Sequence, residues 1–219
     1  MSDSFDYSTT YFCQEGKPNL HACLRIAFEA AKKHEVQKIV IFTGAGEGIR
    51  AASEDYLSQE QYAGIGIVAV TFPHGHKYDI SEDDSNWIAS QHIPLVRAHL
   101  PFDPIKAQYQ SYGILGHDLS LLGNLLTIFG GSMSLCVQAV LMACDAGIVR
   151  KGEHVISLTS DTAILVRSAP TSHLLTDFIV REIFCKSVVM DISKKEMIEP
   201  TTTVETKELD ANPPKLIEG

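Results

Sequence analysis

Residues 38–48, with the sequence Lys38-Ile39-Val40-Ile41-Phe42-Thr43-Gly44-Ala45-Gly46-Glu47-Gly48, carry the strongest structural signal in the chain. The apolar run 38–42 predicts a short strand buried on both faces, as in a parallel sheet. The glycine-rich segment 43–48 predicts a turn, and a helical pattern begins at Ile49 and extends to about residue 61. A strand that leads through a tight turn into a helix indicates an α/β fold.

Helices and strands alternate on both sides of this stretch. Apolar residues recur at three- and four-residue steps from Leu20 to Ala31, which predicts a helix before the strand. Further along the chain we expect strands at 65–71 and 95–98, with a helix at 82–91 between them. Segments 1–17 and 99–118 are expected to be largely irregular, and 119–129 and 133–146 are apolar enough to be buried helices.

The strands of the carboxyl-terminal half are expected to pair antiparallel, unlike those before them. Two apolar runs, 154–158 and 163–166, are separated by only four residues, which suits an antiparallel hairpin and is too short for a parallel crossover. Segment 178–189 alternates like a further strand. The sequence therefore predicts a three-layer α/β sandwich with a mostly parallel sheet that ends in an antiparallel hairpin. Residues 1–190 are expected to form one domain, and 191–219 a polar tail.

Composition narrows the function classes. The 219 residues carry a net charge of −9, which argues against nucleic acid or an anionic membrane as the main partner. No apolar run has the length of a membrane span, and the amino terminus lacks a signal-peptide pattern. Five cysteines without a C-x-x-C pair fit free thiols. We expect a cytoplasmic protein.

The turn after the strand is the first candidate site. Glycines allow backbone N–H groups to face an anion, and ligands of open α/β sheets gather at the carboxyl ends of strands. Ile49 replaces the third glycine of a dinucleotide-binding motif, and the Gly-Lys-Ser/Thr of a P-loop is absent. The alternative is a plain strand–helix turn. We expect a phosphate or mononucleotide contact from Thr43, Gly44, Ala45, Gly46, Glu47 and Gly48.

Two further loops are candidates for the same cleft. His74, Gly75 and His99 follow predicted strands and are expected to line the ligand, although the alternative is solvated loop. His74 and His76 are spaced so that they could share a zinc ion with a third ligand. Zinc binding is not favoured, because the nine histidines are scattered over the chain and no helix motif of histidine and carboxylate accompanies them. Asp161 and Thr162 are expected on the rim of the anion pocket, and their alternative role is an ordinary hairpin turn.

The sequence offers no identifiable nucleophile. Cys136 and Cys144 lie eight positions apart on one predicted helix and are expected in the core, where thiols are usually inert. The G-x-S-x-G motif of serine hydrolases is also missing. Trp87 and Tyr78 are candidates for stacking on a ligand ring, with ordinary packing as the alternative. The sequence therefore assigns no reaction to the protein.

Three stretches resemble one family over about residues 8–187. They are 11–19 with the following helix, 39–48, and 126–148 with its ending Ala143-Cys144-Asp145-Ala146-Gly147-Ile148 before a strand and an Asp161-Thr162-Ala163 turn. In these features the chain resembles the small stand-alone relatives of the pyruvate kinase C-terminal alpha/beta domain. The resemblance implies that fold, no pyruvate kinase activity because the catalytic barrel is missing, and flavin mononucleotide (FMN) as the candidate ligand.

One loop departs from the family pattern. Relatives carry a longer loop of the type G-T-G-R-G-A-D-T-A where this chain has Leu158-Thr159-Ser160-Asp161-Thr162-Ala163. Because the glycines and the arginine are absent, we expect weaker closure over a ligand. The first functional hypothesis is a protein that binds a small anionic ligand, a phosphate compound or a mononucleotide. The alternative is a regulatory or homo-oligomer-forming module without small-molecule chemistry.

Overall fold

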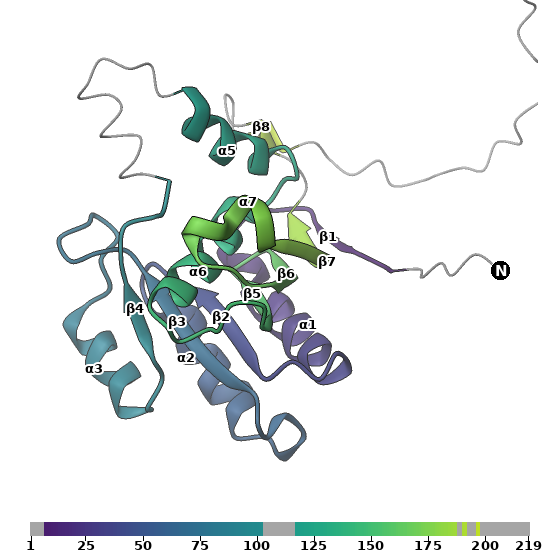
Figure 1. Ribbon diagram of the computed structural model, residues 1–219. Coiled ribbons are helices and arrows are strands. Elements are labelled where there is room, and N and C mark those ends of the chain that lie inside the picture. The colour runs from purple at the N-terminus through teal and green to yellow at the C-terminus, as the bar shows by residue number, and fades with distance from the viewer. Residues whose placement is uncertain (1–6, 103–116, 188–189, 192–195, 198–219) are drawn as a thin grey trace, which may run out of the picture.

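The computed structural model describes residues 7–102, 117–187, 190–191 and 196–197. Within these ranges one sheet has seven strands in the order β1-β7-β6-β5-β2-β3-β4 (Figure 1). Its strands are β1 (Thr10–Phe12), β2 (Lys38–Phe42), β3 (Gly66–Thr71), β4 (Leu95–Arg97), β5 (His154–Leu158), β6 (Ala163–Arg167) and β7 (Ile179–Ser187). The helices are α1 (Leu20–Lys33), α2 (Glu47–Ala52), α3 (Glu82–Ser90), α5 (His117–Thr127), α6 (Met133–Asp145) and α7 (Leu174–Asp177). Two short strands, β8 (Met190–Asp191) and β9 (Glu196–Met197), pair with each other.

The parallel part of the sheet confirms the sequence prediction. β2 pairs in parallel with β3 on one side and with β5 on the other, and β3 pairs in parallel with β4. Side chains of a strand alternate between the two faces of a sheet. Ile39 and Ile41 therefore enter one core, while Val40 and Phe42 enter the other.

The other half of the sheet is mostly antiparallel. β5 and β6 form the predicted hairpin, and β7 continues it as an antiparallel strand. The prediction for the segment 1–17 holds only in part, because Thr10–Phe12 forms β1, which pairs in parallel with the end of β7. A three-residue edge strand gives almost no periodic signal, and its pairing partner is far away in the sequence.

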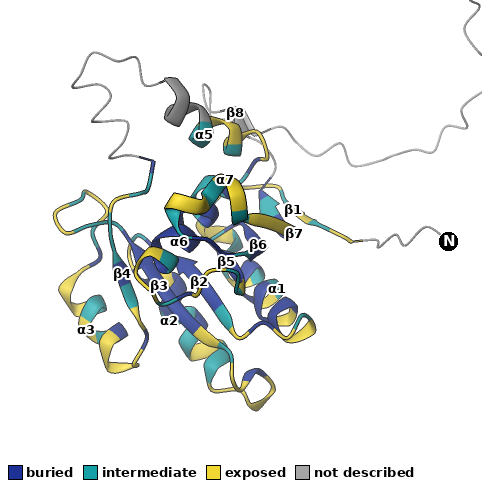
Figure 2. Ribbon diagram, in the orientation of Figure 1, coloured by how far each residue is buried: buried dark blue, intermediate teal, exposed yellow. Residues whose placement is uncertain are grey.

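Helices cover both faces of the sheet. One core contains the buried faces of α1, α2 and α3 against β2 and β3, and the other is built mainly on α6. The burial pattern in Figure 2 shows the strands of the centre as the most deeply buried part of the molecule. α6 is buried along most of its length, as its apolar sequence predicted. The result is an α/β fold in which one β-sheet, with both parallel and antiparallel strand pairs, has helices on either side.

The helix predicted at 119–129 is the clearest correction. A helix is present, as α5, but its carboxyl-terminal part and the following residues are not buried. The exposed fractions are 44% for Leu125, 68% for Ile128 and 48% for Phe129. α6 already covers that face of the sheet, and Leu126 packs against the α6 core from outside.

Other expectations meet the structure only in part. The helix predicted to extend to residue 61 continues beyond α2 as a π-helical turn (Ser53–Leu57) and a 3-10 turn (Glu60–Tyr62). Short 3-10 turns also occur at Lys17–Asn19 and Thr171–His173. Most of the predicted loop 99–118 and of the tail 191–219 lies outside the described residues. None of the helices in the described ranges is long and apolar enough to cross a lipid bilayer.

Candidate functional site

A cleft of about 600 Å³ opens at the carboxyl ends of β2 and β5. From β2 the chain proceeds to β3 on one side, whereas β5 lies on the other side of β2 and is preceded by α6. Such a switch in strand order separates the loops that follow the two strands and leaves a crevice where α/β proteins bind ligands. The cleft is lined by Lys17, Leu20, Ile41, Phe42, Thr43, Gly44, Ala45, Glu47, Gly48, Phe72, Lys77, Tyr78, Asp79, Ser132, Leu135, Thr159 and Ser160.

The turn after β2 is held by its own first residue. Thr43 is buried, and its backbone N–H donates to the carbonyl of Val70 at 2.9 Å. Its Oγ1 accepts a hydrogen bond from the N–H of Gly46, also at 2.9 Å. Gly46 has a φ of 84°, in the left-handed region that favours glycine. This internal bond bends the chain sharply from β2 into α2.

The same turn leaves several donors free. The backbone N–H groups of Gly44, Ala45, Glu47 and Gly48 have no acceptor among the described residues, and all four residues line the cleft. Successive unpaired N–H groups in a tight turn form a concave surface of positive partial charge. Of the predicted phosphate contacts, Gly46 is the exception: its N–H is used by Thr43, and it does not line the cleft.

One wall of the cleft is apolar. Phe72 packs edge-on against Phe42 with ring centroids 5.1 Å apart, and it stacks on His76 at 4.1 Å. Tyr78, which is 54% exposed, continues this wall. Leu135 of α6 also contributes. Trp87, in contrast, lies under the Arg50 guanidinium and does not line the cleft.

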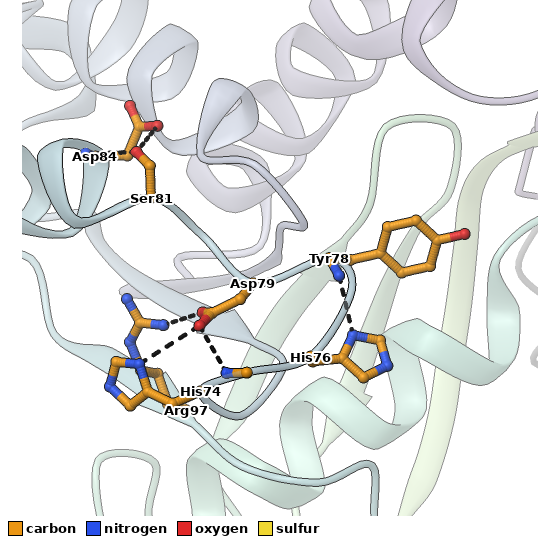
Figure 3. Close-up of polar contacts among 8 residues, drawn as sticks. His74, His76, Tyr78, Asp79, Ser81, Asp84 and Arg97 are labelled. Atoms are coloured by element: carbon orange, nitrogen blue, oxygen red, sulfur yellow. Dashed lines mark hydrogen bonds and ion pairs between the residues drawn. The ribbon is translucent and has the colours of Figure 1, made fainter.

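The loop that carries Tyr78 is organised by Asp79 (Figure 3). Its carboxylate accepts from the N–H of Gly75 at 3.0 Å, forms an ion pair with Arg97, and lies 3.5 Å from Nδ1 of His74. The hydrogen bond from Gly75, followed by the contact with Arg97, lowers the pKa of Asp79. The carboxylate thus fixes the loop in one conformation at the mouth of the cleft.

Cations and carboxylates are balanced around the cleft. Lys17 forms an ion pair with Glu47. The Nζ atom of Lys77 lies 4.6 Å from the ring centroid of Tyr78. The carboxylate of Asp79 is occupied by Arg97, as described above. Lys77 is therefore the lining cation for which no carboxylate partner is found among the described residues.

Asp161 and Thr162 are buried and do not line the cleft, although they were expected on its rim. Asp161 is 2% exposed; its Oδ2 accepts from the N–H of Gly16 at 2.8 Å, and its Oδ1 accepts from Ser132 Oγ at 3.0 Å. Thr159 and Thr162 also donate their hydroxyls to Oδ1. Thr162 Oγ1 in turn accepts from the N–H of Ser132 at 2.8 Å. Their side chains join three segments that border the cleft.

The predicted histidines do not line this cleft. The side chain of His74 is 79% exposed, His99 is exposed, and neither His74, Gly75 nor His99 lines the cleft. Their loop contributes instead through Phe72, Lys77, Tyr78 and Asp79. Among the residues that the structure describes, no three His, Cys, Asp or Glu side chains are grouped to hold a metal ion.

Sequence reasoning missed the lining residues that come from distant segments. Lys17 precedes α1 and Leu20 begins it, while Ser132 precedes α6 and Leu135 lies in its first turn. No local pattern marks them as site residues. Thr159 and Ser160 belong to a turn that the sequence did single out, and these two residues, not Asp161 and Thr162, face the cleft.

No cysteine of the described residues lines this cleft. The Sγ atoms of Cys23 and Cys185 are 3.5 Å apart in the core, and their hydrogen bond, together with burial, raises the pKa of Cys23 well above its ordinary value. Burial likewise raises the pKa of Cys136. Cys144 is only half-buried, so the predicted core position is correct for Cys136 alone of these two. Protonated, buried thiols are poor nucleophiles.

A scan against models of known protein families finds no match for this chain. Among solved structures, it is similar to the pyruvate kinase of Cryptosporidium parvum, with 14% sequence identity and a TM-score of 0.34. The similarity covers 68% of this chain and 22% of the length of that protein. A likeness of this size does not place the chain in a family, so the resemblance drawn from sequence motifs stays a prediction.

Proposed function

We propose that the protein binds a small phosphorylated ligand of the mononucleotide type in the cleft between β2 and β5, with FMN as the first candidate. The observation that carries the proposal is the set of four unpaired N–H groups at Gly44, Ala45, Glu47 and Gly48 on its wall. Backbone groups that are left without partners in a folded protein are satisfied by water or by a ligand. An anion is the ligand that accepts from several N–H groups at once.

The rest of the cleft suits a flat, mostly apolar ring. Phe72 and Tyr78 offer aromatic surface at one wall, and Ile41 and Leu135 offer aliphatic surface. A pocket that combines a large apolar area with few convergent polar groups is typical of small-molecule sites. Its volume of about 600 Å³ lies within the range of such sites. A phosphate at the turn with a ring against the aromatic wall satisfies both parts.

The proposal is tested by titration of the purified protein with FMN, adenosine 5′-monophosphate and inorganic phosphate in a calorimeter. Gly44→Val is the informative variant, because a Cβ at Gly44 meets no atom within 4 Å and Gly44 lines the cleft. We expect the fold to tolerate it and affinity to fall at least about tenfold, since the new side chain occupies the space of the anion.

Gly66→Val is the matched control, because Gly66 begins β3 at the end of the strand opposite to the cleft. Its Cβ would lie 3.8 Å from the carbonyl oxygen of Gln37, an ordinary contact. This variant should bind like the wild type. Absence of heat with all three ligands, at protein concentrations that detect millimolar binding, would overturn the proposal.

A second candidate function, self-assembly without a small ligand, is supported by the exposed apolar residues that follow the middle of α5. Leu125, Ile128 and Phe129 expose apolar surface close together in the sequence. Contiguous exposed apolar surface marks protein–protein contact sites, whereas single exposed apolar residues are common on any protein. In sedimentation experiments, Ile128→Asp should reduce the mass of any oligomer, whereas Leu175→Asp on α7, also exposed, should leave it unchanged.

A further inference from the structure

An ion pair between two distant segments stands at the proposed binding site. Lys17, before α1, and Glu47, at the start of α2, both line the cleft, and their side chains pair with each other. The side chains are 75% and 48% exposed. Exposed pairs of this kind contribute little to stability, because solvent screens them and both side chains lose freedom. The pair is therefore easily exchanged for a stronger partner.

The backbone of Lys17 is fixed even though its side chain is exposed. The N–H of the preceding residue, Gly16, donates to the buried carboxylate of Asp161 at 2.8 Å. Further towards the amino terminus, β1 pairs with β7, and Thr9 Oγ1 donates to the carbonyl of Ile183 at 2.9 Å. A long cationic side chain on an anchored backbone can change partner without moving the segment that carries it.

We infer that the cleft selects a phosphomonoester dianion, and that Lys17 leaves Glu47 to bind it. This inference rests on the proposed function. A monoanionic ligand offers the Lys17 ammonium one negative charge, which the Glu47 carboxylate already provides. The displaced Glu47 carboxylate would then repel that ligand. A phosphomonoester carries about −1.5 to −2 charges near pH 7 and outcompetes a single carboxylate for the ammonium. Lys77 adds a second cation at the cleft, and Asp79 is held by Arg97.

Glu47 thus acts as a built-in competitor of the ligand. In the free protein its carboxylate holds Lys17, and in the complex it is left beside the phosphate. Its removal should strengthen binding, whereas removal of Lys17 should weaken it. A purely structural ion pair predicts the same direction for both variants, so the opposite signs distinguish the two explanations.

The experiment compares Lys17→Met and Glu47→Gln with the wild type by calorimetry at pH 7.5. Three probes share the flavin ring and differ in their phosphate. FMN carries a phosphomonoester dianion, riboflavin carries no phosphate, and riboflavin 4′,5′-cyclic phosphate carries a monoanionic diester. For FMN we expect about tenfold weaker binding by Lys17→Met and about threefold tighter binding by Glu47→Gln. Riboflavin and the cyclic diester should bind the wild type at least about tenfold more weakly than FMN and should respond little to either variant.

Lys33→Met and Glu60→Gln are the charge-matched controls, because both residues are exposed and lie outside the cleft. FMN binding that is unchanged in Lys17→Met, or weakened in Glu47→Gln, would overturn this inference and leave the proposed function intact. Equal affinity for FMN and the cyclic diester would also overturn it. Failure of every probe to bind the wild type would remove the proposed function, and the inference with it.

Discussion

The turns that follow β2 and β5 border the same cleft but use their polar groups in opposite ways. After β2, the N–H groups of Gly44 and its neighbours have no partner among the described residues. After β5, Asp161 and Thr162 are buried and bonded to Gly16 and Ser132. A glycine-rich turn lacks side chains to satisfy its own donors, whereas carboxylate and hydroxyl groups satisfy those of neighbouring segments. We therefore expect the first turn to govern binding and the second to govern stability.

The largest effect is expected at Gly131, beside the second turn. A Cβ there would overlap Oγ1 of Thr162, and the backbone has a φ of 60°. Gly131→Ala should lower the free energy of unfolding by about 3 kcal/mol, because overlap and left-handed strain add. Chemical denaturation measures it. Gly147→Ala is the control, since φ is also positive there and its Cβ meets no atom within 4 Å. Equal losses in both variants would show that contact with Thr162 is unimportant.

The next largest effect on stability is expected at the buried carboxylate of Asp161. Asp161→Asn leaves the side chain the same size but converts one accepting oxygen into a donor, so the bonds from Gly16 and the hydroxyls cannot all remain. We expect the free energy of unfolding, measured by chemical denaturation, to fall by about 2 kcal/mol, as when a buried hydrogen bond to a charged group is lost. Asp83→Asn on the exposed first turn of α3 is the control. Wild-type stability in Asp161→Asn would contradict the role of this turn.

A smaller effect separates stability from binding within the first turn. A Cβ at Gly46 would approach Asp84 Cβ and Ile80 Cδ1 at 3.3 Å, and φ is 84°. Gly46→Ala should therefore lower the free energy of unfolding by about 1 kcal/mol. FMN affinity should stay within about twofold, because Gly46 neither lines the cleft nor offers a free N–H. Calorimetry and denaturation of the same preparation measure both quantities. A large loss of FMN affinity would show that Gly46 contributes to binding as well as to stability, which contradicts this prediction.

The smallest effect belongs to a third turn, after β3. The pKa of Asp79 is lowered in the folded protein, chiefly by the Gly75 N–H, so its contribution to stability is present above about pH 4 and is lost as the pH falls through the folded value. Asp79→Asn should lower the melting temperature slightly at pH 7 and should flatten its decline below pH 4. Thermal unfolding between pH 2 and 7 measures this. A parallel decline in variant and wild type would show that the carboxylate is not stabilised by folding.

The central elements could be predicted because their signals are local. β2 and β3 are continuous apolar runs, and four residues between β5 and β6 leave room only for a hairpin. Burial of the carboxyl-terminal part of α5 and of the residues after it was predicted wrongly from the same kind of signal. An apolar sequence shows that a helix gains from contact, but the space beside the sheet is limited, and α6 already occupies it.

The sequence alone determined the glycine-rich turn after β2, because the turn and its free N–H groups are consequences of neighbouring residues. Only the tertiary structure decided which residues share the cleft with it. Gly16 and Asp161 are 145 positions apart and bond directly, which brings Lys17 to Glu47. Pairings across such separations depend on how the strands are ordered in the sheet and on the packing of helices against it, and no local pattern of residues encodes them.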